Sequence, residues 1–229
     1  MFEQIVVGVD GHAGGLDAIA LAKHLLDADG ELTLAHVLAH DGHAHRGPGE
    51  SYEASGCARA AKLLERMQAE TGVHAHLRWR VAGYVGRGLH ELCEVIGADL
   101  LVVSSSRRGL VGRVLLGDDT RPALDGAPCA IAIAPTNYAR DPVMMRELGV
   151  GYDGTPESEH ALELARKLAQ ELGVQLSGFQ AIPVPSTALS TGPLPFGGMV
   201  SALVAEARER IAALGDIEPH AAYGEAVRG

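Results

Sequence analysis

The strongest constraint on how this 229-residue chain folds is an internal repeat of domain length. The dipeptide Asp-Gly follows an apolar run at residues 10–11 and again at 153–154, an offset of 143 residues. The helical patterns that follow stay in register without a gap, so that Leu25 matches Leu168. Solenoid repeats recur every ~20–50 residues, so a repeat of this length indicates a duplicated domain.

Within the first copy, short runs rich in Val, Ile and Leu alternate with segments of helical pattern. Five strands are predicted, at residues 4–9, 32–38, 75–82, 99–104 and 129–134. Helices are predicted after Gly15 and at 52–71, 86–96 and 117–126. Regular alternation of this kind builds a parallel sheet with helices on both faces. We therefore expect an α/β fold with a doubly wound, five-stranded parallel sheet.

The second copy repeats the front of this pattern. The offset leaves about 50 residues of a complete second copy outside this sequence. After the apolar strand before Asp153 and the helical pattern that follows it, two further strands are predicted at 174–181 and 217–223, with a helix between them at 200–214. The predicted organisation is a complete domain at 1–135, a linker at 136–146 and the front half of a second domain at 147–229.

Charge and composition limit the partners of this chain. The formal net charge of −10 argues against sequence-independent binding to nucleic acid or anionic lipid, because both need basic surface. No apolar run reaches the ~18 residues of a transmembrane helix, and the N-terminus does not resemble a signal peptide. We therefore expect a cytoplasmic protein without a membrane partner. The cysteines form no CxxC motif and are expected to be small core residues: Cys57, Cys93 and Cys129.

The topology of such a sheet indicates where a ligand site lies. In an open parallel sheet, ligands bind beyond the carboxyl ends of the strands, where the strand order reverses. Three predicted loops leave such ends, at residues 10–12, 37–40 and 104–117. Asp10 places a carboxylate at the tip of the first strand, where it either hydrogen-bonds a ribose or caps the next helix. The sequence leaves these two roles open.

The segment from Leu101 to Asp118 carries the most specific motif. It resembles the loop after the fourth strand of the universal stress protein family, in which Gly, two residues, Gly, nine residues and Gly precede Ser or Thr. Val-Gly-Val-Asp at 7–10 and Pro-Cys-Ala-Ile-Ala-Ile at 128–133 match the ends of the family domain, so the resemblance covers residues 1–135 and the front half of the second copy. It implies an adenine nucleotide alpha hydrolase-like fold, a strand order of 3-2-1-4-5, and a site for ATP or AMP.

The chain departs from the family motif at three of its four marked positions. Ser104 and Arg107 stand where the first two glycines belong, Gly117 keeps the third, and Asp118 replaces the hydroxyl residue. Side chains at positions 104 and 107 narrow the approach of a phosphate group to the backbone N–H groups. Asp118 adds a negative charge close to the negatively charged phosphate. Nucleotide binding in the first copy is therefore expected to be weak or lost, although the arginines of this loop offer charge-assisted contacts.

The residues that the resemblance places at nucleotide sites come from both copies. In the second copy, Asp153 and Gly154 retain the family's opening, and no glycine-rich loop follows them within this sequence. The expected cofactor-binding residues are Asp10, Gly11, Val37, Ser104, Ser105, Arg107, Gly117, Asp118, Asp153 and Gly154.

No catalytic site and no metal site is predicted. Hydrolase, metalloprotease and P-loop motifs are absent from the sequence, and Ser104 to Ser106 lack a recognisable His and acid partner. The His-rich tract at 40–45 lacks a second ligand group and is interpreted as a polar loop. Three functions stay open: a stress-response protein that acts through ligand occupancy and partners, a ligand-free dimerisation scaffold, and a slow ATP hydrolase.

The last strand of the first copy, Cys129 to Ala134, lies at the sheet edge in the order that the resemblance implies. Its alternating Ala and Ile make it flat and apolar, and such an edge invites pairing with another strand. In the family this strand pairs with its counterpart in a second domain. The resemblance therefore implies a homodimer or an intramolecular domain pair through these residues.

Overall fold

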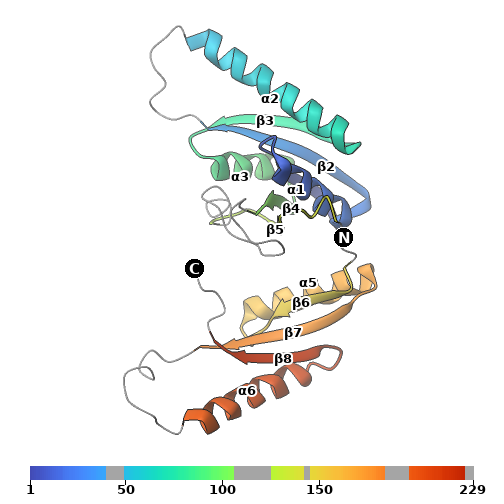
Figure 1. Ribbon diagram of the computed structural model, residues 1–229, viewed down its shortest axis with the longest axis vertical. Helices are drawn as coiled ribbons and strands as arrows, with labels where there is room; N and C mark the ends of the chain where they lie inside the picture. Colours follow the sequence, from blue (N-terminus) through green and yellow to red (C-terminus); the bar gives the residue numbers. More distant parts are fainter. Residues whose placement is uncertain (40–48, 106–124, 142–144, 184–195, 225–229) are drawn as a thin grey trace. The chain divides into compact units, whose positions relative to one another are not determined.

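The computed structural model of the chain describes residues 1–39, 49–105, 125–141, 145–183 and 196–224. The chain divides into two compact units, Met1–Val143 and Met144–Gly229, which are described separately (Figure 1). No helix within the described ranges combines the length and the apolar character needed to cross a bilayer.

The first unit is built on a five-stranded sheet. Its strands are β1 (Phe2–Gly8), β2 (Leu26–Ala39), β3 (His76–Ala82), β4 (Leu100–Ser104) and β5 (Ala130–Ala134). Their order is β3-β2-β1-β4-β5, and every neighbouring pair is parallel. The predicted α/β fold and the predicted order 3-2-1-4-5 are confirmed. The strand order reverses between β1 and β4, so the expected ligand edge lies at the carboxyl ends of these two strands.

Helices cover both faces of this sheet. The described ones are α1 (Ala13–Leu25), α2 (Gly49–Thr71) and α3 (Val85–Ile96). Helix α3 packs on one face, where Leu89 and Leu92 join a buried cluster with Val6 and Val103 of the strands. Helix α2 lies on the opposite side of β2 and β3 from α3 (Figure 1). The helix predicted at 117–126 lies almost wholly outside the described residues.

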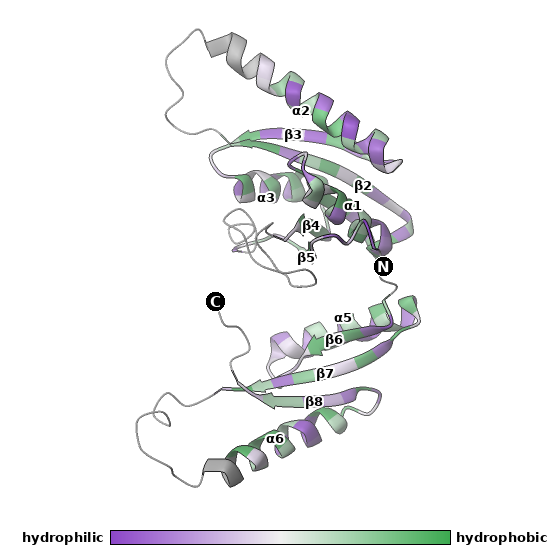
Figure 2. Cartoon of the chain, in the orientation of Figure 1, coloured by the Kyte–Doolittle hydropathy of each residue, from purple (hydrophilic) through white to green (hydrophobic). Residues whose placement is uncertain are grey.

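Helix α2 is amphipathic, and its apolar side explains its position. Ala60, Leu64 and Met67 are buried, whereas the side chains between them are partly or fully exposed. These buried residues follow the three- and four-residue spacing of one helix face. Alternating hydrophilic and hydrophobic turns of α2 are visible in Figure 2.

Asp17 of α1 ties the chain that follows β5 to the first unit. Its Oδ2 accepts a hydrogen bond from the backbone N–H of Asn137 at 2.9 Å, and its Oδ1 accepts one from Ala139 at 2.8 Å. Tyr138, between them, places its hydroxyl 2.8 Å from Nδ1 of His24. Burial raises the pKa of Tyr138. The segment after Pro135, which the sequence predicts as the start of a linker, is therefore held against α1 by buried polar contacts.

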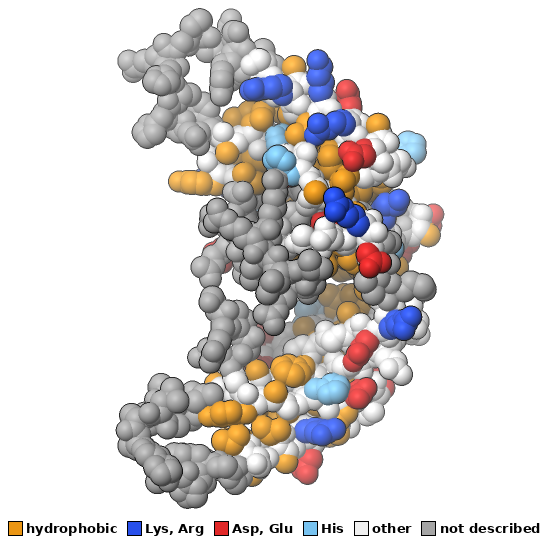
Figure 3. All heavy atoms as spheres, in the orientation of Figure 1, with side chains coloured by type: hydrophobic (Ala, Val, Ile, Leu, Met, Phe, Trp, Pro, Cys, Tyr) orange, Lys and Arg blue, Asp and Glu red, His pale blue; other side chains and the backbone are white. Residues whose placement is uncertain are grey.

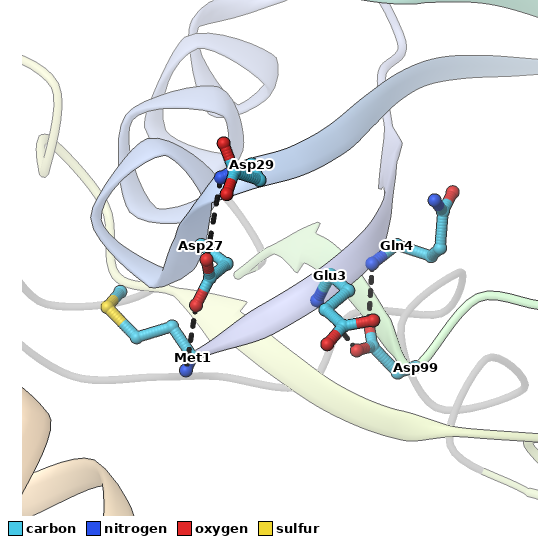
Figure 4. Close-up of polar contacts among 6 residues, drawn as sticks. All are labelled: Met1, Glu3, Gln4, Asp27, Asp29 and Asp99. Atoms are coloured by element: carbon cyan, nitrogen blue, oxygen red, sulfur yellow. Dashed lines mark hydrogen bonds and ion pairs between the residues drawn. The ribbon is translucent and has the colours of Figure 1, made fainter.

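Polar contacts also join the elements at the opposite, N-terminal edge of this sheet (Figure 4). The carboxylate of Asp99 accepts the backbone N–H groups of Glu3 at 2.8 Å and Gln4 at 3.0 Å. Asp27 accepts the backbone N–H of Asp29 and pairs with the N-terminal ammonium of Met1. The hydrogen bond from Asp29 and then the ammonium hold the pKa of Asp27 below its usual value.

In its described residues, the second unit contains a three-stranded sheet with two helices. Its elements are β6 (Glu147–Gly151), α5 (Pro156–Leu172), β7 (Gln175–Ile182), α6 (Phe196–Ala212) and β8 (Glu218–Tyr223). The strand order β6-β7-β8 is parallel and repeats the order β1-β2-β3. Gly149 pairs with Ser177 as Val6 pairs with Thr33, so the two sheets can be compared position by position.

Among the described residues, helices cover one face of the three-stranded sheet and leave the other uncovered. Val150, Leu176 and Ile211 belong to a single buried cluster, which places α6 against the face of Val150. Phe179 lies on the opposite face and is exposed, and no helix covers that face within the described ranges. Assignment of this unit as a second domain of the same family remains a prediction.

Candidate functional site

The turn after β1 brings Asp10 and Gly11 to the carboxyl end of the first sheet. The Oδ1 atom of Asp10 accepts the backbone N–H of His12 at 2.9 Å, which closes a short turn before α1. Gly11 has φ of 79°, a left-handed conformation that favours glycine. A Cβ at this glycine would also lie 2.6 Å from Cδ1 of Leu63 in α2. Any larger residue at position 11 would therefore strain the turn.

The start of α1 lacks the side-chain cap that the sequence offers as one role for Asp10. The N-cap residue is His12, and its side chain makes no capping hydrogen bond. The observed bond of Asp10 reaches the N-cap residue itself, whereas a capping side chain bonds the second or third helical residue.

The second unit carries a more complete version of the same turn. Asp153 Oδ1 accepts hydrogen bonds from the Thr155 hydroxyl at 2.7 Å and from its backbone N–H at 3.0 Å. Thr155 in turn caps α5 by accepting the N–H of Ser158, and Gly154 between them has φ of 83°. The hydrogen bonds from Thr155 hold the pKa of Asp153 below its usual value. Asp153 is therefore a carboxylate fixed in place by its own turn.

Ser104 lies against the N-terminal turn of α1. A Cβ built on Gly14 would be 2.7 Å from the Ser104 Oγ and 3.0 Å from its Cβ. The hydroxymethyl group of Ser104 therefore occupies space that a side chain at position 14 would need. Asp10, Gly11 and Ser104 thus gather around the start of α1, because β1 and β4 are neighbours in the sheet.

The remaining described site residues of the first unit point into the protein. Val37 is buried in the cluster under α3, where its methyl groups face Gly88. Ser105 is also buried: its N–H donates to the carbonyl of Ala134 at 2.9 Å, and its hydroxyl lies 3.1 Å from the hydroxyl of Thr136. These side chains hold β2 and β5 in place. Three predicted site residues lie outside the described residues: Arg107, Gly117 and Asp118.

Two residues near this edge are not predicted as site residues from the sequence. The Nη2 atom of Arg66, from α2, donates to the carbonyl of Gly11 at 3.1 Å. The Nδ1 atom of His36 lies 2.7 Å from the carbonyl of Val9. Arg66 stands among other charged residues of an amphipathic helix, and His36 stands inside an apolar strand, so no local motif marks either of them.

Charged side chains of both signs are mixed on one face of the described elements (Figure 3). On the face shown in Figure 3, Lys and Arg side chains are interspersed with Asp and Glu over the described elements, without a continuous basic patch. The expectation that nucleic acid is not a partner, which follows from the net charge of −10, stays a prediction.

Comparison with known families gives a match over the first part of the chain. The model of the Universal stress protein family matches residues 1–135. Universal stress protein Rv2319c of Mycobacterium tuberculosis (strain ATCC 25618 / H37Rv) is 29% identical over 123 residues. Universal stress protein Mb2346c of Mycobacterium bovis is equally similar. The aligned part is 54% of this chain and 42% of each relative, so the chain spans less than half the length of these relatives.

Solved structures share the fold over both units. A universal stress protein from Archaeoglobus fulgidus DSM 4304 has a TM-score of 0.63 and 15% identity, and the likeness covers 98% of this chain and 79% of that one. A protein of unknown function, PA1789 from Pseudomonas aeruginosa PAO1, has a TM-score of 0.57 and 16% identity, with 99% and 74% covered. At these identities the likeness concerns the fold alone.

Proposed function

This chain belongs to the universal stress protein family, and from that premise we propose a cytoplasmic stress-response protein that acts through association with partners and not through catalysis. In its first unit, binding of ATP or AMP is weak or lost. The observation that carries this proposal is the position of Ser104. This residue stands where the family motif has its first glycine, and its side chain lies against the start of α1.

The physical argument concerns access to the backbone. A phosphate group binds at a helix N-terminus because free N–H groups and the helix dipole face it, and glycines let it come close. Ser104 replaces the first of these glycines, and its Oγ lies 2.7 Å from the position of a Cβ built on Gly14, near the start of α1. Asp118, which the sequence places where the family has a hydroxyl residue, would add electrostatic repulsion.

We expect calorimetric titration of the protein with ATP, with and without magnesium, to give an affinity weaker than the micromolar range. Replacing Asp118 with Ser should improve the affinity about tenfold, because two unit charges at ~4 Å repel by about 1 kcal/mol in water and by more near a protein surface. Asp29→Ser removes an equal charge at the opposite edge of the sheet and should leave the affinity unchanged. Micromolar binding by the unmodified protein would contradict the proposal.

A dimerisation scaffold is the second candidate function, and strand β5 favours it. This strand is the edge of the first sheet, and Ile131 and Ile133 on it are only partly buried. An apolar edge strand of this kind presents unpaired backbone groups to another strand. We propose that β5 pairs with the same strand of a second copy of this chain. A slow ATP hydrolase has less support, because the sequence contains no hydrolase or P-loop motif.

Replacing Ile131 with Lys tests this pairing. The added charge would enter the contact between two apolar strands, so we expect the dimer dissociation constant to rise about tenfold or more, which is at least about 1.4 kcal/mol. Analytical ultracentrifugation over a range of concentrations measures it. Val81→Lys, on the opposite edge strand β3, is the matched control and should leave association unchanged. An unmodified protein that stays monomeric at high concentration would refute the pairing.

A further inference from the structure

At the N-terminal edge of the second sheet, the edge opposite the Asp153 turn, three ligand-type side chains converge. The donor atoms of Glu147, Glu218 and His220 all lie within 4.8 Å of one another. Glu147 begins β6, and the other two are the first and third residues of β8. We propose that this corner is a three-ligand site for a divalent transition metal, with zinc as the ion that its donors suit best.

The strand register explains why these side chains meet. Ser177 of β7 pairs with Gly149, two residues after Glu147, and also with Glu218. Side chains two residues apart point to the same face of a strand, so Glu147, Ser177, Glu218 and His220 share one face. That face lies opposite the cluster formed with α6 and is the uncovered one. Strands β6 and β8 therefore deliver the ligands from the two sides of β7.

The chemistry of the donors fits zinc. One imidazole and two carboxylates form a mixed nitrogen and oxygen set, which zinc accepts at about 2.0–2.2 Å per ligand in three-ligand sites that keep a position for water. Neutral imidazole favours transition metals over magnesium and calcium, which take oxygen ligands. The hydroxyl of the buried Ser177 donates to Oε1 of Glu147. A hydrogen bond of this type orients a ligating carboxylate.

The first unit provides an internal comparison. The positions equivalent by register to Glu147, Ser177, Glu218 and His220 are Gln4, Thr33, His76 and Arg78. These four positions hold no carboxylate, and the guanidinium of Arg78 repels a cation, so the fold itself does not require carboxylates at this corner. The second unit alone combines two carboxylates with an imidazole there.

The same comparison shows that such a corner is accessible. In the first unit, His76 and its neighbour Glu31 remain 58% and 61% exposed although five strands and α3 are in place. In the second unit, His220 and Glu218 are 44% and 62% exposed, with His220 Nε2 at 3.7 Å from Glu218 Oε1. Exposed side chains can rotate by the small amount needed to close around an ion.

Isothermal titration of the full chain with zinc chloride tests the site. We expect the unmodified protein to bind zinc, and Glu218→Gln and His220→Ala each to remove one equivalent or to weaken it at least about tenfold. Ser177→Ala should weaken it by about tenfold, the usual effect of losing a hydrogen bond to a ligand. Magnesium in place of zinc should give little heat. Zinc should also raise the melting temperature of the unmodified protein and not that of Glu218→Gln.

Matched controls separate this corner from other zinc ligands in the chain. His76→Ala and Glu31→Gln alter the equivalent corner of the first unit and should leave zinc binding unchanged. A variant with alanine at His40, His43 and His45 removes the His-rich tract and should keep the equivalent that Glu218→Gln loses. Circular dichroism of each variant verifies folding. The proposal is overturned if His220→Ala and Glu218→Gln bind zinc with the stoichiometry and affinity of the unmodified protein, or if that protein binds none.

Discussion

Replacing Asp17 with Ala should lower the free energy of unfolding of the first unit by about 3 kcal/mol, because buried hydrogen bonds to a charged group each contribute about 1.5–3 kcal/mol. The Asp17 carboxylate is buried and accepts two backbone N–H groups, from Asn137 and Ala139. Alanine would leave both donors without a partner. Asn137 also holds a left-handed conformation, with φ of 69°, which the surrounding contacts must maintain.

Urea denaturation followed by circular dichroism measures this effect, and two variants sharpen it. Asp17→Asn keeps one carbonyl acceptor and should lose a smaller part of the stability. His160 occupies the position equivalent to Asp17 in the second copy and is exposed, so His160→Ala should change stability by less than about 0.5 kcal/mol. If Asp17→Ala were as mild as His160→Ala, the segment after β5 would not depend on this carboxylate.

Replacing Gly88 with Val should destabilise the first unit by about 3 kcal/mol, the upper part of the usual range for overpacking a core. A Cβ at Gly88 would lie 2.6 Å and 2.9 Å from the two methyl groups of Val37, and 3.0 Å from the Cβ of Ala82. The close approach of α3 to β2 and β3 therefore depends on the missing side chain. A branched residue would push the helix away from the sheet.

A second substitution tests whether Val37 is the residue that collides. Val37→Ala in the Gly88→Val protein removes the two methyl groups that the new side chain would meet. The free energy of unfolding of the double variant should therefore be at least about 1 kcal/mol higher than that of Gly88→Val alone. Gly83→Val is the control, because nothing lies within 4 Å of its Cβ position, and its effect should stay within about 0.5 kcal/mol. Additive losses in the double variant would show that the helix and the strand do not meet through this pair.

The sequence by itself determined the class of the fold, and it predicts the duplication and the weak point of the nucleotide motif. These follow from local signals: β-branched runs such as residues 4–9, the Asp-Gly turns, and Ser104, Arg107 and Asp118 at the places of small residues. Each signal depends on residues close together in the chain. The backbone preference of a β-branched run and the apolar period of a helix need no distant partner.

Only the tertiary structure decided which distant residues touch. Asp17 meets the segment at 137–139 across more than a hundred residues of chain, and Ser104 meets Gly14 because β4 lies beside β1. The convergence of Glu147, Glu218 and His220 likewise depends on the register of β6, β7 and β8. Strand register arises from the packing of the whole sheet, and a shift by one residue would turn every side chain to the other face. No local pattern contains that information.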